Sequence, residues 1–398
     1  MRRSFLSVAA AGVLALAACG SGGGDTNTGS GPGGIKPPKI DKLASLGQGE
    51  GQVNLVAWAG YAENGSSDPK VNWVTPFEQK TGCKVNTKIA GTSDEMVTLM
   101  KSGDYDAVSA SGDASLRLIY GGTVQPINTD LVPNYKDIFD FLKNKPWNSV
   151  DNQMYGIPHG WGANLLMYRT DKVNPAPTSW GAVFDGASTY AGKVTAYDSP
   201  IYIADAALYL MKHKPELKIT NPYALDDSQF NAAVELLKTQ NKSIGEYWSD
   251  YTKEVEAFKS GNSVIGTTWQ VIANLAEADK APVKAILPDE GATGWSDTWM
   301  VAAKAAHPNC AYMWLDWIVS PDANAQVAEW FGESPSNKLA CDKTSDKGFC
   351  QTYHASDADY SSKIWYWTTP TAQCLDGRTN ATCKDYAAWA QAWTQIKG

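Results

Sequence analysis

The sequence predicts an α/β fold in which helices flank one or more sheets. From residue 52 onward, short apolar segments with strand character alternate with segments that carry apolar residues at helical spacing. Such alternation is typical of sheets covered by helices. Residues 50–398 are also long enough to form one large domain or two medium ones.

The first elements alternate regularly between strand and helix. The first predicted helix ends at Thr81-Gly82, as a glycine-terminated helix should, and the second begins with a capping sequence at Ser93. In order, we predict a strand at 52–58, a helix at 71–80, a strand at 83–89, a helix at 93–101 and a strand at 105–109.

The middle of the chain contains an extended run that is typical of a crossing between two parts of a fold. Residues 155–163 lead into the apolar segment 164–168, and their glycines would let the backbone pass close to a ligand. A strand at 263–269 delivers Trp269 to its end. The remaining predicted elements are helices at 229–239 and 255–259, a strand at 298–303, and helices at about 310–319 and 321–330.

The amino terminus has the features of a bacterial lipoprotein export signal. Residues 1–18 carry two arginines and then an apolar run that is too short to span a bilayer comfortably. Leu16-Ala17-Ala18-Cys19 looks like a lipobox, so we expect cleavage before Cys19 and attachment of a lipid to its sulfur. Arg2 and Arg3 also partly match a twin-arginine signal, and the choice of export route stays open.

Residues 19–49 are predicted to be a flexible, lipid-anchored tether. They are rich in Gly, Ser, Thr and Pro and contain few large apolar residues, so they cannot bury enough surface to fold. The whole chain is acidic, with 34 Lys and Arg against 42 Asp and Glu, and it has no basic cluster. It is therefore a poor candidate for binding nucleic acid.

Six cysteines follow Cys19, and an even number in an exported chain indicates disulfides. There is no Cys-x-x-Cys pair and the four histidines are scattered, so a thiolate zinc site is not expected and no cofactor is predicted. Six cysteines allow fifteen pairings. The spacing favours two short loops and one long connection, namely Cys341 with Cys350, Cys374 with Cys383, and Cys83 with Cys310.

The stretch 290–303 carries the clearest candidate for a binding site. Trp295 and Asp297 are two residues apart, so on an extended backbone they point to the same side. An aromatic face beside a carboxylate suits an organic cation, because the ring attracts the charge and the carboxylate pairs with an ammonium group. The alternative is that Trp295 packs in a core and Asp297 caps a turn.

Several motifs, taken in order, resemble the solute-binding proteins of ABC importers, in the cluster that includes the spermidine/putrescine-binding proteins. No one motif is diagnostic, but together they span nearly everything after the tether. They are Trp58 with Tyr61, Phe77-Glu-Gln-Lys-Thr-Gly82, Gly103-Asp-Tyr-Asp-Ala-Val108, Gly156-Ile-Pro158 with Trp161-Gly162, Thr178-Ser-Trp180, Trp269, Gly294-Trp-Ser-Asp297, and Pro321 to Phe331.

The resemblance implies a two-lobed, periplasmic-binding-protein-like fold of type II. Its lobes would be joined by strand crossings, with the ligand cleft between them. Lobe 1 would comprise 50–157 and 297–333, and lobe 2 would comprise 158–296 and 334–398. The implied protein is an extracytoplasmic, membrane-anchored monomer that captures a polyamine or related cation and delivers it to an ABC permease.

The resemblance also implies which residues bind the ligand. In polyamine-binding relatives, aromatic rings sandwich the methylene chain and acidic residues take the amino groups. The residues on matching positions are Trp58, Tyr61, Trp269, Trp295 and Asp297, and Asp198 lies in a loop where relatives carry further acidic residues.

The chain departs from the family pattern at three positions. Gly60 stands where an acidic residue is expected, and Tyr202 stands where a second ammonium-binding glutamate would be. Glu333 replaces an aromatic position and could supply the missing charge. A cationic ligand remains the prediction, with spermidine, putrescine or another amine all compatible.

Other ligand classes and an enzyme are the alternatives. After the signal the chain has only three arginines, Arg117, Arg169 and Arg378, and none lies in a predicted cleft stretch, so carboxylate and phosphate ligands are disfavoured. A sugar is the second candidate, and ferric iron is less favoured because no adjacent tyrosine pair occurs in the carboxyl-terminal half. An enzyme on the same fold is disfavoured, because the even cysteine count leaves no free thiol and no hydrolase motif is present.

Overall fold

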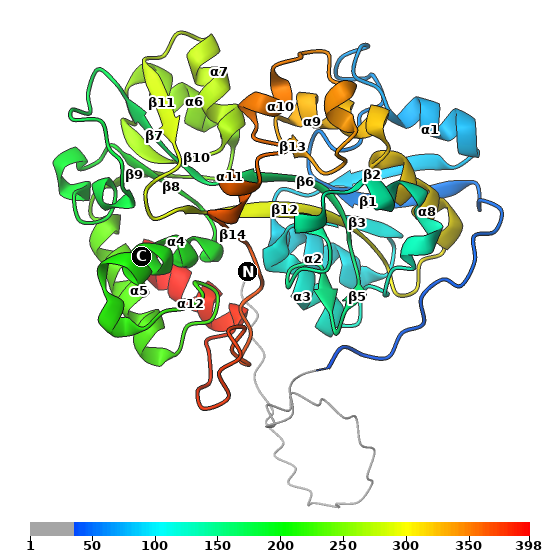
Figure 1. Cartoon of the computed structure of the whole chain (residues 1–398), viewed down its shortest axis with the longest axis horizontal. Coiled ribbons are helices and arrows are strands. Elements are labelled where there is room, and N and C mark those ends of the chain that lie inside the picture. Colours follow the sequence, from blue (N-terminus) through cyan, green and yellow to red (C-terminus); the bar gives the residue numbers. More distant parts are fainter. Residues whose placement is uncertain (1–35) are drawn as a thin grey trace, which may run out of the picture. The chain divides into compact units, whose positions relative to one another are not determined.

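A computed structural model describes residues 36–398, which form two sheets connected by extended segments (Figure 1). The predicted signal peptide at 1–18, the lipidation site Cys19 and the tether up to residue 35 lie outside the described residues. No helix within 36–398 is both long enough and apolar enough to cross a membrane.

The strands belong to a seven-stranded sheet, a five-stranded sheet and one small hairpin. We call the larger two the first and the second sheet. The strands are β1 (Gln52–Ala57), β2 (Lys84–Ile89), β3 (Ala107–Ala110), β4 (Ser149–Val150), β5 (Gln153–Met154), β6 (Ile157–Ala163), β7 (Leu165–Arg169), β8 (Val194–Tyr197), β9 (Ile244–Trp248), β10 (Ile265–Thr268), β11 (Val283–Ile286), β12 (Ala292–Val301), β13 (Ser334–Pro335) and β14 (Ile364–Tyr366).

The helices cover both faces of each sheet (Figure 1). They are α1 (Val74–Thr81), α2 (Ser93–Ser102), α3 (Gly112–Tyr120), α4 (Ile203–His213), α5 (Asp227–Asn241), α6 (Tyr251–Ser260), α7 (Gln270–Ala278), α8 (Pro308–Ile318), α9 (Pro321–Phe331), α10 (Phe349–Thr352), α11 (Ala358–Ser362) and α12 (Tyr386–Lys397). Each predicted strand and helix matches one of these elements, and most bounds differ by only a few residues.

Both sheets combine parallel and antiparallel strands. The first has the order β13-β6-β12-β3-β1-β2, with β14 also paired to β12, and β1 runs parallel to β2 and β3. The second has the order β11-β7-β10-β8-β9, with β8 parallel to β9 and β10. The carboxyl ends of the parallel strands in each sheet meet at one edge, which is where α/β proteins commonly bind ligands.

Two extended segments carry the chain from one sheet to the other. β6 of the first sheet continues through Asn164 into β7 of the second, and β11 of the second is followed by β12 of the first. By sheet membership, the chain therefore changes sheets at Asn164 and between residues 286 and 292. The lobe boundaries predicted at 157/158 and 296/297 stay predictions. The placing of 334–398 with lobe 2 also stays a prediction, because β13 and β14 pair with the first sheet while α12 packs on α5.

Alternating side chains of the strands fill a separate apolar layer on each face of a sheet. In β1, Val53 and Leu55 pack in the layer that contains Phe77 of α1, whereas Val56 packs with Met96 of α2. This is the period of two expected for a strand that is buried on both faces. The second sheet repeats the arrangement, with α4, α5 and α12 on one face and α6 and α7 on the other.

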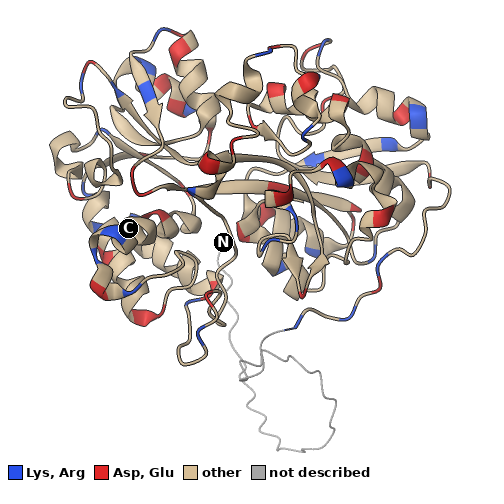
Figure 2. Ribbon diagram, viewed as in Figure 1, with Lys and Arg blue, Asp and Glu red and all other residues tan. Residues whose placement is uncertain are grey.

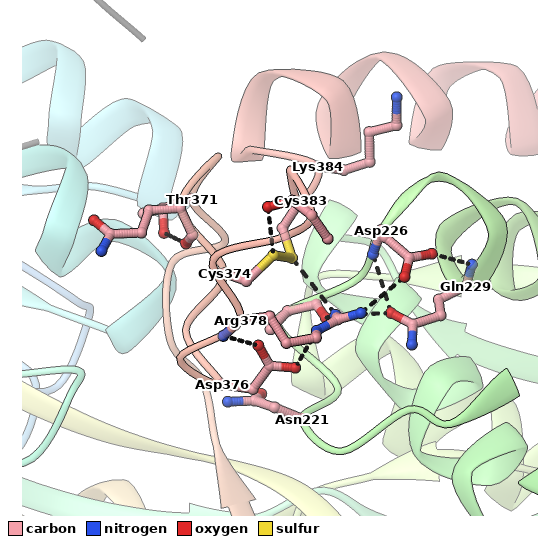
Figure 3. Close-up of a disulfide and its surroundings, with 12 residues drawn as sticks. Asn221, Asp226, Gln229, Thr371, Cys374, Asp376, Arg378, Cys383 and Lys384 are labelled. Carbon is pink, nitrogen blue, oxygen red and sulfur yellow. Dashed lines mark hydrogen bonds and ion pairs between the residues drawn. A yellow bond between two sulfur atoms is a disulfide. The ribbon is translucent and has the colours of Figure 1, made fainter. Parts of the chain in front are cut away.

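Three disulfides join Cys83 to Cys310, Cys341 to Cys350, and Cys374 to Cys383, which are the pairs that the spacing favoured. The last of them closes a loop that holds Arg378 against the start of α5 (Figure 3). Arg378 Nη1 donates to Asp226 Oδ2 at 2.8 Å, and its Nη2 donates to the Ala224 carbonyl at 2.7 Å. The loop is thereby fixed to the second sheet's helices.

The described end of the predicted tether contacts the folded unit. The Leu43 carbonyl accepts a hydrogen bond from Asn128 Nδ2 at 3.1 Å, and the Gly47 amide donates to Asn309 Oδ1 at 2.6 Å. The segment up to residue 49 is therefore attached at its carboxyl end, which the composition alone did not reveal. Acidic and basic residues are intermingled over the helices and loops of the described part (Figure 2).

Candidate functional site

A cavity of about 250 Å³ lies where the carboxyl ends of strands from both sheets meet. We call it the aromatic cavity. The first sheet contributes residues at the ends of β1, β2 and β3 and two residues on β12, and the second contributes residues at the ends of β8, β9 and β10. Its lining consists of Trp58, Ala59, Ile89, Ala90, Gly91, Ser111, Tyr197, Ser249, Asp250, Tyr251, Trp269, Trp295, Asp297, Phe331 and Trp367.

Aromatic rings from distant parts of the chain form most of this lining. Trp269 and Trp295 meet edge to face with their centroids 5.9 Å apart, and Trp295 meets Phe331 in the same way at 6.1 Å. Tyr197 stacks on Trp367 at 5.5 Å with an interplanar angle of 18°. These contacts hold the rings in fixed orientations, so that they present π faces and edges to a ligand at little entropic cost.

The orientation of Trp269 is fixed by a chain of hydrogen bonds between side chains. Its Nε1 donates to Asn164 Oδ1 at 2.9 Å, and Asn164 Nδ2 donates to Thr293 Oγ1 at 2.7 Å. The Thr293 hydroxyl in turn donates to Asp205 Oδ1 at 2.9 Å. Because these residues come from both crossings and from α4, the position of Trp269 depends on the packing of both sheets.

Two glycines of β6 make room for side chains of the site. Gly162 lies opposite Trp295 in the ladder, and a Cβ at Gly162 would come within 2.7 Å of the indole. A Cβ at Gly160 would clash with the Glu333 carboxyl group. The sequence suggested that these glycines admit a ligand. The structure corrects this, because the space they leave is occupied by Trp295 and Glu333.

The carboxyl group of Asp297 is the buried charge of the aromatic cavity. The residue is 3% exposed, and its Oδ2 accepts a hydrogen bond from the Tyr61 hydroxyl at 2.8 Å. Its Oδ1 has no hydrogen-bond partner within residues 36–398. Burial is the main cause that raises the pKa of Asp297 to about 6, the side chains of Ser111 and Tyr61 oppose this rise, and the nearby carboxylate of Asp113 adds to it. Asp297 is therefore mostly ionised at neutral pH and has one oxygen available to a donor.

The Tyr61 hydroxyl lies between two buried carboxyl groups. Besides its contact with Asp297, it lies 2.9 Å from Glu333 Oε2. A neutral tyrosine has one proton to donate, so one of the two carboxyl groups must itself carry a proton. Burial raises the pKa of Glu333 well above its usual value, and the charge of Asp297 raises it further. Glu333 therefore holds the proton and donates it to Tyr61, which donates its own proton to Asp297.

A buried histidine completes the surroundings of Glu333. Trp299 Nε1 donates to His159 Nδ1 at 3.2 Å, so the neutral imidazole carries its proton on Nε2. That nitrogen lies 3.2 Å from Glu333 Oε1 without the alignment of a hydrogen bond. Burial lowers the pKa of His159 to about 3, so the histidine is neutral. Asp297 is consequently the one anion of this group of four residues.

Residues 72–348 match the family described as bacterial extracellular solute-binding protein, and this match covers more than half of the chain. The protein belongs to this family. The chain is also similar to the spermidine/putrescine-binding periplasmic protein of Escherichia coli (strain K12), with 25% identity over 302 residues, which cover 73% of this chain and 83% of that protein.

Solved structures show the same fold. A structure described as a spermidine/putrescine ABC transporter from Listeria monocytogenes superposes with a TM-score of 0.71 at 16% identity and covers 87% of this chain and 99% of that one. The structure of the PBP MotA from A. tumefaciens B6 in complex with glucopine superposes with a TM-score of 0.66 at 18% identity. This match covers 87% of this chain and 100% of that one. The two-lobed fold predicted from the motifs is confirmed.

The structure of this binding protein brings four of the predicted site residues together. Trp58, Trp269, Trp295 and Asp297 all line the aromatic cavity, and Trp295 and Asp297 do so from one face of β12, as their spacing predicted. Tyr61 is fully buried behind Asp297, and Glu333 lies behind Tyr61. Glu333 borders a separate void of about 20 Å³ and is not part of the aromatic cavity's lining, so its predicted charge contact with the ligand stays a prediction.

Asp198 and Tyr202 do not line the aromatic cavity, so their assignment as ligand-binding residues stays a prediction without support from this cavity. Asp198 accepts hydrogen bonds from Trp393 Nε1 at 3.0 Å and Lys397 Nζ at 2.6 Å. Tyr202 is 1% exposed and its hydroxyl accepts from Gln240 Nε2 at 2.9 Å. Both residues stabilise the packing of α12 against the second sheet's helices, and no sequence pattern indicated where α12 would lie.

The sequence reasoning missed the other residues of the cavity lining, and we consider four of them, Tyr197, Asp250, Tyr251 and Trp367. Three of them stand at the end of β8 or directly after β9. The rule that ligands bind at the carboxyl ends of parallel strands could have found these three. Trp367 follows β14 near the carboxyl terminus, and no local pattern marks it. No group of three or more His, Cys, Asp or Glu that could hold a metal ion occurs within residues 36–398.

Proposed function

We propose that the protein is the extracytoplasmic solute-binding subunit of an ABC importer and that it captures a polyamine or related organic cation, such as putrescine or spermidine. One observation carries this proposal, namely that Asp297 presents an unpartnered, buried carboxylate oxygen to a cavity lined with aromatic rings. A buried anion without a partner is costly, and an ammonium group would supply both the missing charge and the missing donors.

The positions of the basic residues support a cation over an anion. No lysine or arginine belongs to the lining of the aromatic cavity. The three arginines in residues 36–398 have acidic partners elsewhere, since Arg117 pairs with Asp94, Arg169 with Asp171, and Arg378 with Asp226 and Asp376. A carboxylate or phosphate ligand would therefore meet a like charge and no arginine.

The comparisons support the same class of ligand without deciding it. The Escherichia coli relative is named for spermidine and putrescine, whereas a structure with this fold holds glucopine. The fold therefore leaves the ligand open, and the cation assignment depends on the residues of the cavity.

We further propose that Cys19 carries the lipid anchor, that the protein works as a monomer with a membrane permease, and that it has no catalytic activity. All six cysteines of residues 36–398 are in disulfides, so none of them offers a nucleophilic thiol.

Calorimetric titration tests the proposal directly. Putrescine, spermidine, glucose and maltose are titrated separately into the purified protein at neutral pH and moderate salt. We expect saturable binding of at least one of the two amines and none of the sugars. Binding of a sugar together with no binding of either amine would contradict the cation assignment and favour the sugar-importer alternative.

A further inference from the structure

The aromatic cavity contains a second carboxylate that the sequence motifs did not identify. Among the lining residues, the acidic ones are Asp297 and Asp250, and no basic residue accompanies them. Asp297 lies on β12 of the first sheet, and Asp250 directly follows β9 of the second. A ligand that reaches both carboxylates would therefore contact both sheets at once.

Asp250 is held in a defined orientation as the N-cap of α6. Its Oδ1 accepts hydrogen bonds from the Thr252 amide at 3.0 Å and from the Thr252 hydroxyl at 2.6 Å. The hydrogen bond from the Thr252 side chain is the main cause that lowers the pKa of Asp250. Partial desolvation opposes this shift, but the backbone amides of Thr252 and Lys253 and the charge of Lys253 add to it, so the exposed Asp250 is ionised at neutral pH.

The other acidic residues near the cavity are not available for a second ammonium group. Glu333 is buried and protonated behind Tyr61, and Asp198 is paired with Lys397. Asp113 is 2% exposed, accepts a hydrogen bond from the Ser93 hydroxyl at 2.9 Å, and is absent from the cavity lining. Asp250 is thus the remaining carboxylate that faces the same space as Asp297.

Two anions that come from different sheets and line the same aromatic cavity match one particular ligand chemistry. An α,ω-diamine carries an ammonium group at each end and an apolar methylene chain between them. The chain would lie against rings such as Trp269 and Trp295, and each end would meet one carboxylate. A monoamine would leave one of the carboxylates without a partner, and a sugar would leave both without a cation.

We propose that Asp250 binds the second ammonium group of an α,ω-diamine whose first ammonium group is bound by Asp297. Asp250 is then the residue that makes the site selective for diamines over monoamines. Because the two carboxylates belong to different sheets, the diamine joins the two halves of the cavity, which a monoamine cannot do. This inference rests on the proposed function and adds to it the number and placing of the ligand's charges.

The variant Asp250→Asn tests the inference without removing the helix cap. Asparagine caps helices about as well as aspartate, so α6 should be retained and the thermal stability of the ligand-free protein should change little. Asp385→Asn is the matched control, because Asp385 caps α12 through the Ala388 amide and lies outside the cavity lining. Calorimetry then measures the binding of putrescine and of n-butylamine, a monoamine of equal chain length, to wild type and both variants.

We expect Asp250→Asn to weaken putrescine binding by roughly five- to thirtyfold, between the effect of an exposed ion pair and that of a buried one. Binding of n-butylamine should stay within about twofold of wild type, and Asp385→Asn should change neither ligand. The selectivity for putrescine over n-butylamine should therefore fall in Asp250→Asn alone.

Three results would overturn the inference, and they are distinguishable from one another. If wild type binds neither spermidine, putrescine nor n-butylamine, the proposed function fails and the inference fails with it. If wild type binds putrescine and Asp250→Asn binds it equally well, the proposed function stands and Asp250 is a helix cap only. If Asp250→Asn weakens both ligands by the same factor, the carboxylate acts on the cavity as a whole and does not recognise a second ammonium group.

Discussion

The two sheets present their carboxylates to the aromatic cavity in opposite ways. Asp297 is 3% exposed on the longest strand of the first sheet, and its neighbours are Tyr61 and a protonated Glu333. Asp250 is exposed at the amino terminus of a helix that follows the second sheet's edge strand, and Thr252 holds it in place. The first group has lost its water in the ligand-free protein, whereas the second has kept most of it.

This difference predicts how the two groups divide the work of binding. The cost of burying Asp297 is met when the protein folds, so an ammonium group that reaches it gains a strong and poorly screened interaction. Asp250 interacts through a higher effective dielectric and should contribute less to affinity. Asp297 should therefore determine whether an amine binds, and Asp250 should determine which amine binds.

The largest effect is expected for Asp297→Asn, which keeps the shape of the side chain and removes its charge. Loss of a desolvated charge pair should weaken amine binding by roughly 2–5 kcal/mol, or about thirtyfold to several thousandfold. Calorimetry with putrescine measures this, and circular dichroism checks that the variant is folded. Equal binding by the variant would mean that Asp297 is a structural residue and that the two carboxylates do not differ as described.

The aromatic lining should contribute the next largest effect. Trp295→Ala removes one ring but leaves Trp269 and the others, so affinity should fall by roughly 1–3 kcal/mol. Trp365→Ala is a matched control, because Trp365 is a partly buried tryptophan that borders a different cavity, of about 380 Å³. Equal losses of affinity in the two variants would indicate general destabilisation and not loss of a ring that contacts the ligand.

The pH dependence of binding should report the buried carboxylate specifically. With the pKa of Asp297 at about 6, the group is mostly ionised at pH 7 and mostly protonated at pH 5, while the amine stays charged. Affinity for putrescine should therefore fall by about tenfold over this interval, since a proton must leave before the ammonium group can pair. Asp113, with a pKa of about 6, and Asp205, with a pKa of about 7, also titrate in or near this range, whereas Tyr61 and Glu333 stay protonated.

The variant Asp297→Asn separates these contributions. If the pH dependence arises from Asp297, it should disappear in the variant. If it persists, Asp113 or another group is responsible. In the ligand-free protein, stability should change with pH in the opposite direction from affinity. Because the pKa of Asp297 is raised in the folded protein, its contribution to the free energy of unfolding is full below about pH 4 and is lost as the pH rises through about 6.

The smallest effect is expected at Asp198, which the motif pattern assigned to the ligand. Because its carboxylate pairs with Lys397 and Trp393, Asp198→Asn should leave putrescine affinity within about twofold of wild type. The free energy of unfolding should fall by less than about 1 kcal/mol, as for other partly exposed ion pairs. A large loss of affinity without a loss of stability would restore Asp198 to the binding site.

The sequence by itself determined the fold class and the first five elements of the chain. Apolar periodicity located β1, α1, β2, α2 and β3 to within a few residues, because strands buried on both faces and glycine-terminated helices leave strong local patterns. The spacing of Trp295 and Asp297 gave their common direction, because side chains of a strand alternate between its two faces. The ordered motifs also identified the correct family, since they span most of the residues that match it.

Only the tertiary structure decided which charges face the ligand. Tyr61 contacts Asp297 across 236 positions of sequence and Glu333 across 272 positions. These contacts leave Asp297 as the single anion of the group. Asp198 and Asp250 are both aspartates near strand ends of the second sheet, and no local pattern tells them apart. α12 supplies Lys397 and Trp393 to Asp198, and nothing comparable covers Asp250. The charge and accessibility of a carboxylate depend on its burial and on its partners. Both are set by contacts between segments that are distant in sequence, so the neighbouring residues in the sequence do not determine them.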